Sequence, residues 1–157
     1  MTSAIYAGSF DPFTNGHLDI VKKASKIFDK VIIVIAINAK KVRTYNAYNM
    51  CSAISKTLQE NYLSNCMVVT YDGLVAELAY DWDVPYLIRG LRNIQDYNYE
   101  EEMSKINAEL NAEIETIYFR SNQDIVSSSF VKELYNLKYD ISNYVPSAVL
   151  KLMEECK

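Results

Sequence analysis

The chain has 157 residues, of which 50% are hydrophobic, and this is enough for one folded unit with its own core and without metal or disulfide support. Its 16 basic and 20 acidic residues give a formal net charge of -4, which argues against sequence-independent binding of nucleic acid. A small anionic ligand would need only a local basic patch.

The cysteines and the lengths of the apolar segments indicate where in the cell the protein is expected. Cys51, Cys66 and Cys156 are far apart and form no Cys-x-x-Cys pair, so they indicate neither a disulfide framework nor a zinc site. The chain contains no secretory signal pattern and no apolar run of about 18 residues, the length that a membrane span needs. We therefore expect a cytoplasmic protein with no membrane partner.

The first motif is a strand, a turn and the start of a helix. Apolar residues from Ile5 lead to Gly8, Ser9 supplies a hydroxyl in the turn, and a helical pattern begins around Thr14 to His17. Free backbone N–H groups and the positive end of the helix dipole at such a junction favour a phosphate. His17 is the sole histidine, and its position is compatible with a structural helix cap or with an anion site.

Strands and helices alternate along the rest of the chain. The pattern predicts further strands over 31–36, 67–71, 86–88 and 115–119, and helices from Leu18 to near Phe28 and over 47–62, 74–79, 96–110, from 127 and from Pro146. Alternation of this kind indicates an α/β fold, a doubly wound five-stranded parallel sheet with helices on both faces. We expect a single domain over residues 1–157, with its cleft at the carboxyl edge of the sheet.

Three polar segments follow strands and would meet at that edge. A basic loop at 38–43 contains Lys40 and Lys41, and an Arg-Gly-Leu-Arg segment follows Ile88. The loop could be merely solvated and the arginines could form structural ion pairs, but arginine forks bind phosphate well. Ser127, Ser128 and Ser129 begin a later helix, where they could act as a simple cap or as a second phosphate cradle.

Two common nucleotide motifs are absent from the sequence. Neither Gly-x-Gly-x-x-Gly nor Gly-x-x-x-x-Gly-Lys-Ser/Thr occurs, which argues against a dinucleotide enzyme and a phosphate-loop kinase. No serine, cysteine or lysine nucleophile has a histidine at a recognisable spacing, so no covalent enzyme intermediate is indicated. A phosphate group already present on a substrate could itself act as the nucleophile.

Twelve residues of the first motif, Tyr6-Ala-Gly-Ser-Phe-Asp-Pro-Phe-Thr-Asn-Gly-His17, resemble the opening of the phosphopantetheine adenylyltransferase family, nucleotidyltransferases with a Thr/His-x-Gly-His motif. The Arg89-Gly-Leu-Arg92 segment and the serine run also match motifs of that family, in the expected order. The resemblance spans nearly the whole chain and implies a Rossmann-like nucleotidyltransferase fold.

The resemblance implies a role for each motif. His17 would stabilise the transition state, and the ATP site would comprise Ser9, Phe10, His17, Gly90, Leu91, Arg92, Glu100, Ser127, Ser128 and Ser129. The 4′-phosphopantetheine site would comprise Ser9, Lys41, Leu74, Val75 and Arg89. Glu101 and Glu102, which follow Glu100, are expected on a solvated face.

Two segments depart from the family pattern. Residues 42–50 replace a usual Pro and a Phe-Ser/Thr-x-Glu-Glu-Arg stretch, which leaves the choice between Lys40 and Lys41 open. The link at 122–126 is shorter than usual and lacks a common aromatic residue.

The implied reaction transfers the adenylyl group of ATP to 4′-phosphopantetheine, giving dephospho-coenzyme A and pyrophosphate. Mg²⁺ would be held mainly by the nucleotide and water, because the sequence offers no carboxylate cage. The resemblance also implies a homohexamer and feedback by coenzyme A. Two alternatives are another small phosphate as acceptor, such as nicotinate mononucleotide, and a nucleotide-binding module without catalysis.

Overall fold

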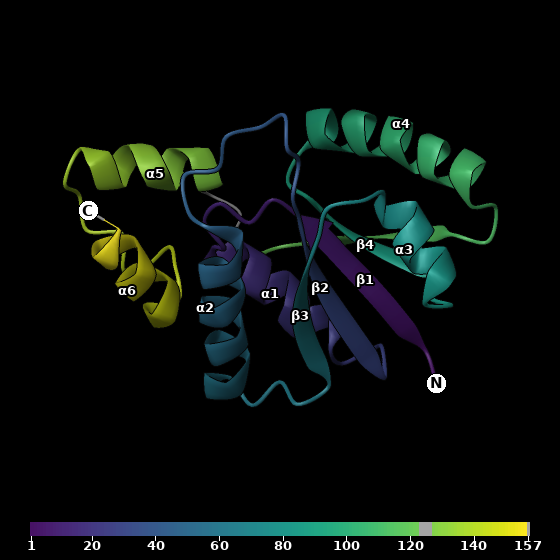
Figure 1. The fold of residues 1–157 in the computed structure, drawn as a ribbon, viewed down its shortest axis with the longest axis horizontal. Helices are drawn as coiled ribbons and strands as arrows, with labels where there is room; N and C mark the ends of the chain where they lie inside the picture. The colour runs from purple at the N-terminus through teal and green to yellow at the C-terminus, as the bar shows by residue number, and fades with distance from the viewer. Residues whose placement is uncertain (123–126, 157) are drawn as a thin grey trace.

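The computed structural model describes residues 1–122 and 127–156, and a five-stranded sheet runs through it (Figure 1). All the pairings among its strands are parallel, and the strand order is β3-β2-β1-β4-β5. The strands are β1 (Ser3–Gly8), β2 (Lys30–Ala36), β3 (Cys66–Tyr71), β4 (Tyr86–Leu91) and β5 (Glu115–Arg120). The chain winds outward from β1 to β3, then returns to β4 beside β1, so the switch point of the sheet lies between β1 and β4.

Helices pack on both faces of the sheet. They are α1 (Asn15–Ala24), α2 (Ala47–Glu60), α3 (Val75–Asp81), α4 (Ile94–Leu110), α5 (Ser128–Asn136) and α6 (Ser147–Glu155). One buried cluster joins the sheet to α1, α2 and α6, and a second joins the opposite face to α3. In Figure 1, α4 and α5 lie at the carboxyl end of β1, away from the N-terminus. The predicted doubly wound α/β fold is confirmed.

The alternation of side chains along β1 sets up the two faces. Tyr6 is buried with the α1 side, and Ile5 is buried with the α3 side. Residues 31–35 of β2 are all buried, as expected for a continuous β-branched run in a central strand. None of the helices in the described part of the chain is long and apolar enough to cross a membrane.

The first helix is one turn shorter than its apolar pattern predicts. It ends at Ala24, not near Phe28, and Ile27 is 64% exposed. The side-chain amide of Asn65 donates to the carbonyls of Ser25 and Phe28 at 2.9 and 3.1 Å, and so satisfies backbone acceptors that a longer helix would have used. A contact 40 residues away therefore decides where this helix stops.

The fourth strand is longer than predicted. Arg89, Gly90 and Leu91 do not follow the strand but are its last residues, paired with β5 from Tyr118 to Arg120. Their side chains therefore alternate between the two faces of the sheet. A Cβ on Gly90 would lie 2.5 Å from Cδ1 of Ile20, so any other residue here would force the end of the Ile20 side chain on α1 to move. Pro146, predicted in the first turn of its helix, is the N-cap of α6.

Candidate active site

The turn after β1 has an unusual backbone. Phe10 has a φ of 45°, a left-handed conformation that non-glycine residues seldom adopt without support from their surroundings. The support comes from burial, because only 3% of Phe10 is exposed and its ring packs edge-on to that of Tyr6 at 5.2 Å. The adjacent Ser9 is exposed. The turn is therefore held by the core while its outer residue remains accessible.

Thr14 and His17 form a capping box at the start of α1. The Thr14 hydroxyl accepts a hydrogen bond from the His17 N–H at 3.3 Å, and Nδ1 of His17 accepts one from the Thr14 N–H at 3.0 Å. Since Nδ1 is an acceptor, the ring proton of the neutral imidazole lies on Nε2. The structural and the functional readings of His17 are thus compatible, because one nitrogen caps the helix and the other can donate to a ligand.

The surroundings of His17 keep it uncharged. Its ring packs against those of Phe10 and Phe13, with centroids 4.9 and 5.5 Å away. Burial, together with the positive charges of Arg92 and Arg89, lowers the pKa of His17 from 6.5 to about 4. At neutral pH His17 is therefore a neutral hydrogen-bond donor.

Arg89 and Glu100 form a two-pronged ion pair between β4 and α4. Nε of Arg89 donates to Oε2 of Glu100 at 2.6 Å, and Nη2 donates to Oε1 at 2.8 Å. Nη1 donates to the Ala7 carbonyl at 2.9 Å. Although burial opposes the charge, the hydrogen bonds and the carboxylate of Glu100 raise the pKa of Arg89. A guanidinium with these contacts still has N–H donors for a phosphate.

Arg92 lies in a more open place. Its Nε donates to Oδ2 of Asp96 at 2.9 Å, and 45% of the Arg92 side chain is exposed, against 31% for Arg89. Each arginine of the motif therefore has a carboxylate partner on α4, and phosphate binding by the arginines stays a prediction. Exposed pairs such as that of Arg92 are weak, which leaves Arg92 able to turn towards a ligand.

Two of the serines at the start of α5 make different contacts. The Ser127 hydroxyl caps the helix by accepting from the Phe130 N–H at 3.2 Å. The Ser128 hydroxyl donates to the Pro12 carbonyl at 2.8 Å and ties this helix to the turn after β1. The residues at 123–126, which include most of the divergent link, lie outside the described part of the chain.

A cavity of about 360 Å³ brings together the residues of the predicted ATP site. Among its walls are the turn after β1, the start of α1, the end of β4 and the start of α5. Every residue predicted for ATP lines it: Ser9, Phe10, His17, Gly90, Leu91, Arg92, Glu100, Ser127, Ser128 and Ser129. We name this space the nucleotide-side cavity. The sequence motifs, far apart along the chain, are thus brought to one place.

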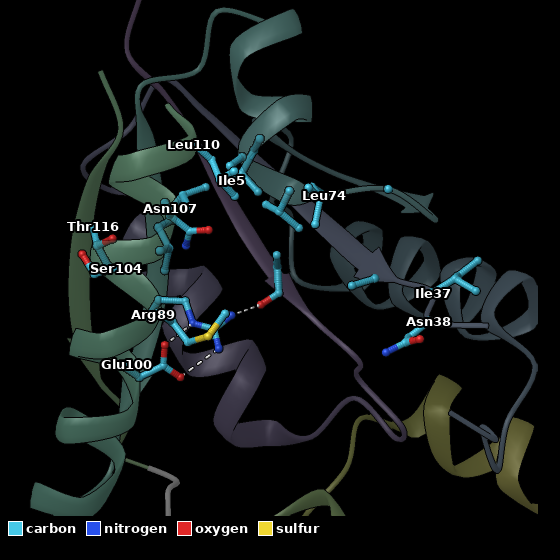
Figure 2. A pocket seen from close by; sticks show the side chains of 18 of the residues that line it. Ile5, Ile37, Asn38, Leu74, Arg89, Glu100, Ser104, Asn107, Leu110 and Thr116 are labelled. Atoms are coloured by element: carbon cyan, nitrogen blue, oxygen red, sulfur yellow. Dashed lines mark hydrogen bonds and ion pairs between the residues drawn. The ribbon is translucent and has the colours of Figure 1, made fainter. Parts of the chain in front are cut away.

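A second cavity of about 650 Å³ lies on the other face of the sheet, between α3 and α4 (Figure 2). Leu74 and Val75 line it as predicted, and Ser104, Asn107 and Thr116 add polar groups from α4 and β5. Lys40 is among its lining residues, whereas the exposed Lys41 is not. We name this space the acceptor-side cavity.

The two cavities meet at a shared wall. Ala7, Arg89 and Glu100 line both of them, and Figure 2 shows the Arg89–Glu100 pair at one end of the acceptor-side cavity. A group bound in either space would therefore meet the same guanidinium. This arrangement suits a reaction that joins two ligands through a phosphate.

Known proteins resemble the chain over its whole length. A family model described as cytidylyltransferase-like matches residues 5–134. The phosphopantetheine adenylyltransferase of Vesicomyosocius okutanii is 39% identical over 153 residues, covering 96% of both chains, and that of Alkaliphilus metalliredigens is 38% identical over 157 residues, covering 99% of both. The chain belongs to the phosphopantetheine adenylyltransferase family. Its members are nucleotidyltransferases of coenzyme A biosynthesis, and the predicted resemblance and enzyme class are confirmed.

A solved structure supports the fold alone. The crystal structure of a Vibrio parahaemolyticus protein assigned as a nicotinate-nucleotide adenylyltransferase superimposes with a TM-score of 0.72 and covers 99% of this chain and 93% of its own. The two sequences are only 17% identical. The agreement is therefore one of architecture, as expected for a fold shared by several nucleotidyltransferases.

Sequence reasoning for this family member missed several residues of the site. Thr14, Asp96, Ser104 and Asn107 were not singled out, although all of them line one of the cavities. The Thr-x-x-His spacing is a capping-box pattern and could have been recognised. The others carry no local signal, because only the packing of α4 against the sheet brings them to the cavities.

The described residues contain no group of three or more His, Cys, Asp or Glu side chains placed to hold a metal ion. Near the nucleotide-side cavity, the carboxylates of Asp96 and Glu100 are already engaged by Arg92 and Arg89. A magnesium cage made by these side chains does not fit this arrangement. Magnesium that arrives with a nucleotide, as part of the substrate, needs no such cage.

Proposed function

We propose that this chain transfers the adenylyl group of ATP to 4′-phosphopantetheine by direct in-line attack, with His17 as the transition-state donor. An oxygen of the acceptor phosphate attacks the α-phosphorus, the bond from that phosphorus to the bridging oxygen breaks, and pyrophosphate leaves. The observation that carries the proposal is the shared wall of the two cavities at Arg89, with a neutral His17 lining the nucleotide side.

His17 would act through its Nε2–H. The capping hydrogen bond to Nδ1 fixes the ring and the tautomer before any substrate binds. A preorganised donor stabilises charge that develops on a non-bridging oxygen of the α-phosphate, without the cost of reorienting at the moment of reaction. Because its pKa is low, His17 would serve as a donor of a hydrogen bond and keep its proton.

The two arginines and the start of α5 would bind different phosphate groups of the substrates. Arg89, oriented by Glu100 and the Ala7 carbonyl, would hold the acceptor phosphate at the junction. Arg92 and the N–H groups at the start of α5 would hold the β- and γ-phosphates of ATP. Mg²⁺ would enter bound to ATP as part of the substrate.

The acceptor-side cavity would hold the pantetheine arm. Leu74 and Val75 supply an apolar wall, and the amides of the arm can pair with Ser104 and Asn107 across the cavity. A lysine of the 38–43 loop would add a positive charge at the mouth. Lys41 stays the residue predicted from the family, while Lys40 is the one that lines the cavity.

The test is pyrophosphate release from the purified protein with ATP and Mg²⁺, measured with 4′-phosphopantetheine, with nicotinate mononucleotide and without acceptor. We expect release only with 4′-phosphopantetheine. Release with nicotinate mononucleotide instead would reassign the acceptor. ATP binding without release under any condition would favour a nucleotide-binding module and contradict the proposal.

Four expectations, three from the family and one from composition, stay predictions. They are the hexamer, the feedback by coenzyme A, the role of Mg²⁺ and the cytoplasmic location. Sedimentation of the purified protein and inhibition by added coenzyme A would test the first two directly.

A further inference from the structure

We propose that Arg43 is a positioning residue that holds the Ser9–Phe10 peptide in the orientation that binds the phosphates of ATP. This inference rests on the proposed function for the identity of the nucleotide. It concerns a residue of the segment 42–50, which departs from the family pattern.

The guanidinium of Arg43 joins the divergent loop to the turn after β1. Its Nη1 donates to the Ser9 carbonyl at 2.6 Å, and its Nε donates to the Tyr45 carbonyl at 3.0 Å. Only 15% of the Arg43 side chain is exposed, although Ser9 itself is exposed. Hydrogen bonds from a charged donor are stronger than those between neutral groups.

Asp11, in the turn after β1, also binds the loop that carries Arg43. Its carboxylate accepts the N–H groups of Thr44 and Tyr45 at 2.8 and 2.9 Å, and lies 3.9 Å from Nη2 of Arg43. Nζ of Lys132, on α5, approaches the same carboxylate at 3.6 Å. Asp11 therefore fixes the backbone of the loop at Thr44 and Tyr45. Arg43 fixes the same loop to the Ser9 carbonyl.

The geometry of one peptide plane links Arg43 to the nucleotide-side cavity. The Ser9–Phe10 peptide is trans, so its carbonyl and its N–H point in opposite directions. Ser9 and Phe10 line the cavity, whereas Arg43, which binds the carbonyl, is not among the lining residues. Holding the carbonyl on the outer side therefore turns the Phe10 N–H the other way, towards the cavity.

The left-handed conformation of Phe10 makes this support necessary. A non-glycine residue with a φ of 45° is strained, and it keeps that conformation only when neighbouring contacts fix it. Burial of the ring fixes the side chain, and the bond from Arg43 fixes the preceding peptide. Without Arg43 the plane could rotate, and the cavity would lose a backbone donor for phosphate.

The experiment measures ATP affinity by calorimetry for the wild type, Arg43→Gln and Arg43→Lys, together with KM for both substrates. We expect Arg43→Gln to weaken ATP binding about tenfold, as loss of one charge-assisted hydrogen bond predicts, and Arg43→Lys to weaken it less. KM for 4′-phosphopantetheine should change less than twofold. In HSQC spectra, the shift of the Phe10 amide on adding ATP should shrink in Arg43→Gln.

Lys132→Met is the matched control, because it also removes a cation beside Asp11 but leaves the Ser9 carbonyl held. If anchoring of the loop alone mattered, Lys132→Met and Arg43→Gln would weaken ATP binding equally, and the inference would be overturned. It would also be overturned if Arg43→Gln lowered Tm but left ATP affinity unchanged. Titration with ATP needs no turnover, so a wild type that binds ATP without releasing pyrophosphate would contradict the proposed function alone.

Discussion

The nucleotide-side and acceptor-side cavities differ in how the chain builds them. The first is lined by short contiguous motifs, namely the turn before His17, the Arg89-to-Arg92 segment and the serines from 127 to 129. The second takes its walls from all the segments β1, β2 and the loop after it, the start of α3 and the loop before it, β4, α4 and β5. A phosphate needs backbone N–H groups and fixed charges, which a local turn can supply, whereas an extended arm needs a long wall that only tertiary packing makes.

The largest expected effect comes from breaking the nucleotide side at His17. In His17→Ala we expect kcat to fall at least about a hundredfold, as for loss of one transition-state donor, while ATP still binds. Stopped-flow measurement of pyrophosphate release checks kcat, and calorimetry checks binding. His17→Gln is the control, since glutamine can also complete a capping box. Full activity in His17→Gln would reduce His17 to a helix cap.

Glu100→Gln tests the shared wall and should have the next largest effect. Removing the carboxylate charge releases Arg89 from its fixed orientation, so we expect KM to rise about tenfold for ATP and for 4′-phosphopantetheine together. Initial rates with each substrate varied in turn give both values. Glu102→Gln, on an exposed position of the same helix, is the control. An increase for only one substrate would assign Glu100 to one cavity.

The next prediction tests which lysine of the 38–43 loop binds 4′-phosphopantetheine. We expect alanine at the lysine that binds acceptor to raise KM for 4′-phosphopantetheine about fivefold, the cost of one partly exposed charge contact, and to leave ATP affinity unchanged. Comparison of Lys40→Ala with Lys41→Ala in the same assay decides between the lining residue and the one that the family predicts. A loss of ATP affinity in either variant would assign that lysine to the nucleotide-side cavity and contradict the prediction.

The smallest effect concerns pH and the buried imidazole. Because the folded pKa of His17 is about 4 and the ordinary value is 6.5, the unfolded chain binds more protons between these pH values, and folding stability falls as pH drops from 6.5 towards 4. As the sole histidine, His17 gives one set of ring signals by NMR, and these should not shift between pH 8 and about 5.5. Midpoints of urea unfolding at pH 7 and 5 should differ less in His17→Gln. Titration near 6.5 would contradict the enclosed, neutral ring.

The same contrast explains what could be predicted from sequence. The continuous apolar run at 31–36 identifies a central strand, and the pattern from Ile5 to His17 identifies the turn between the first strand and the first helix, because both signals are local. The end of α1 could not be predicted, since the amide of Asn65 sets it. The extension of β4 through Arg89 depends on pairing with β5, and the role of Arg43 depends on a contact with Ser9, 34 positions earlier. Pairing and contacts over such separations leave no periodic pattern.

The shared wall has a consequence for how the two ligands influence each other. Arg89 lines both cavities, so a ligand in one cavity that shifted this guanidinium would change the electrostatic potential in the other. Under the proposed function, thermodynamic reciprocity would then require ATP to change the affinity for the acceptor by the same factor that the acceptor changes the affinity for ATP. The coupling between the two substrates would pass through the Arg89 side chain, which Glu100 holds in its orientation.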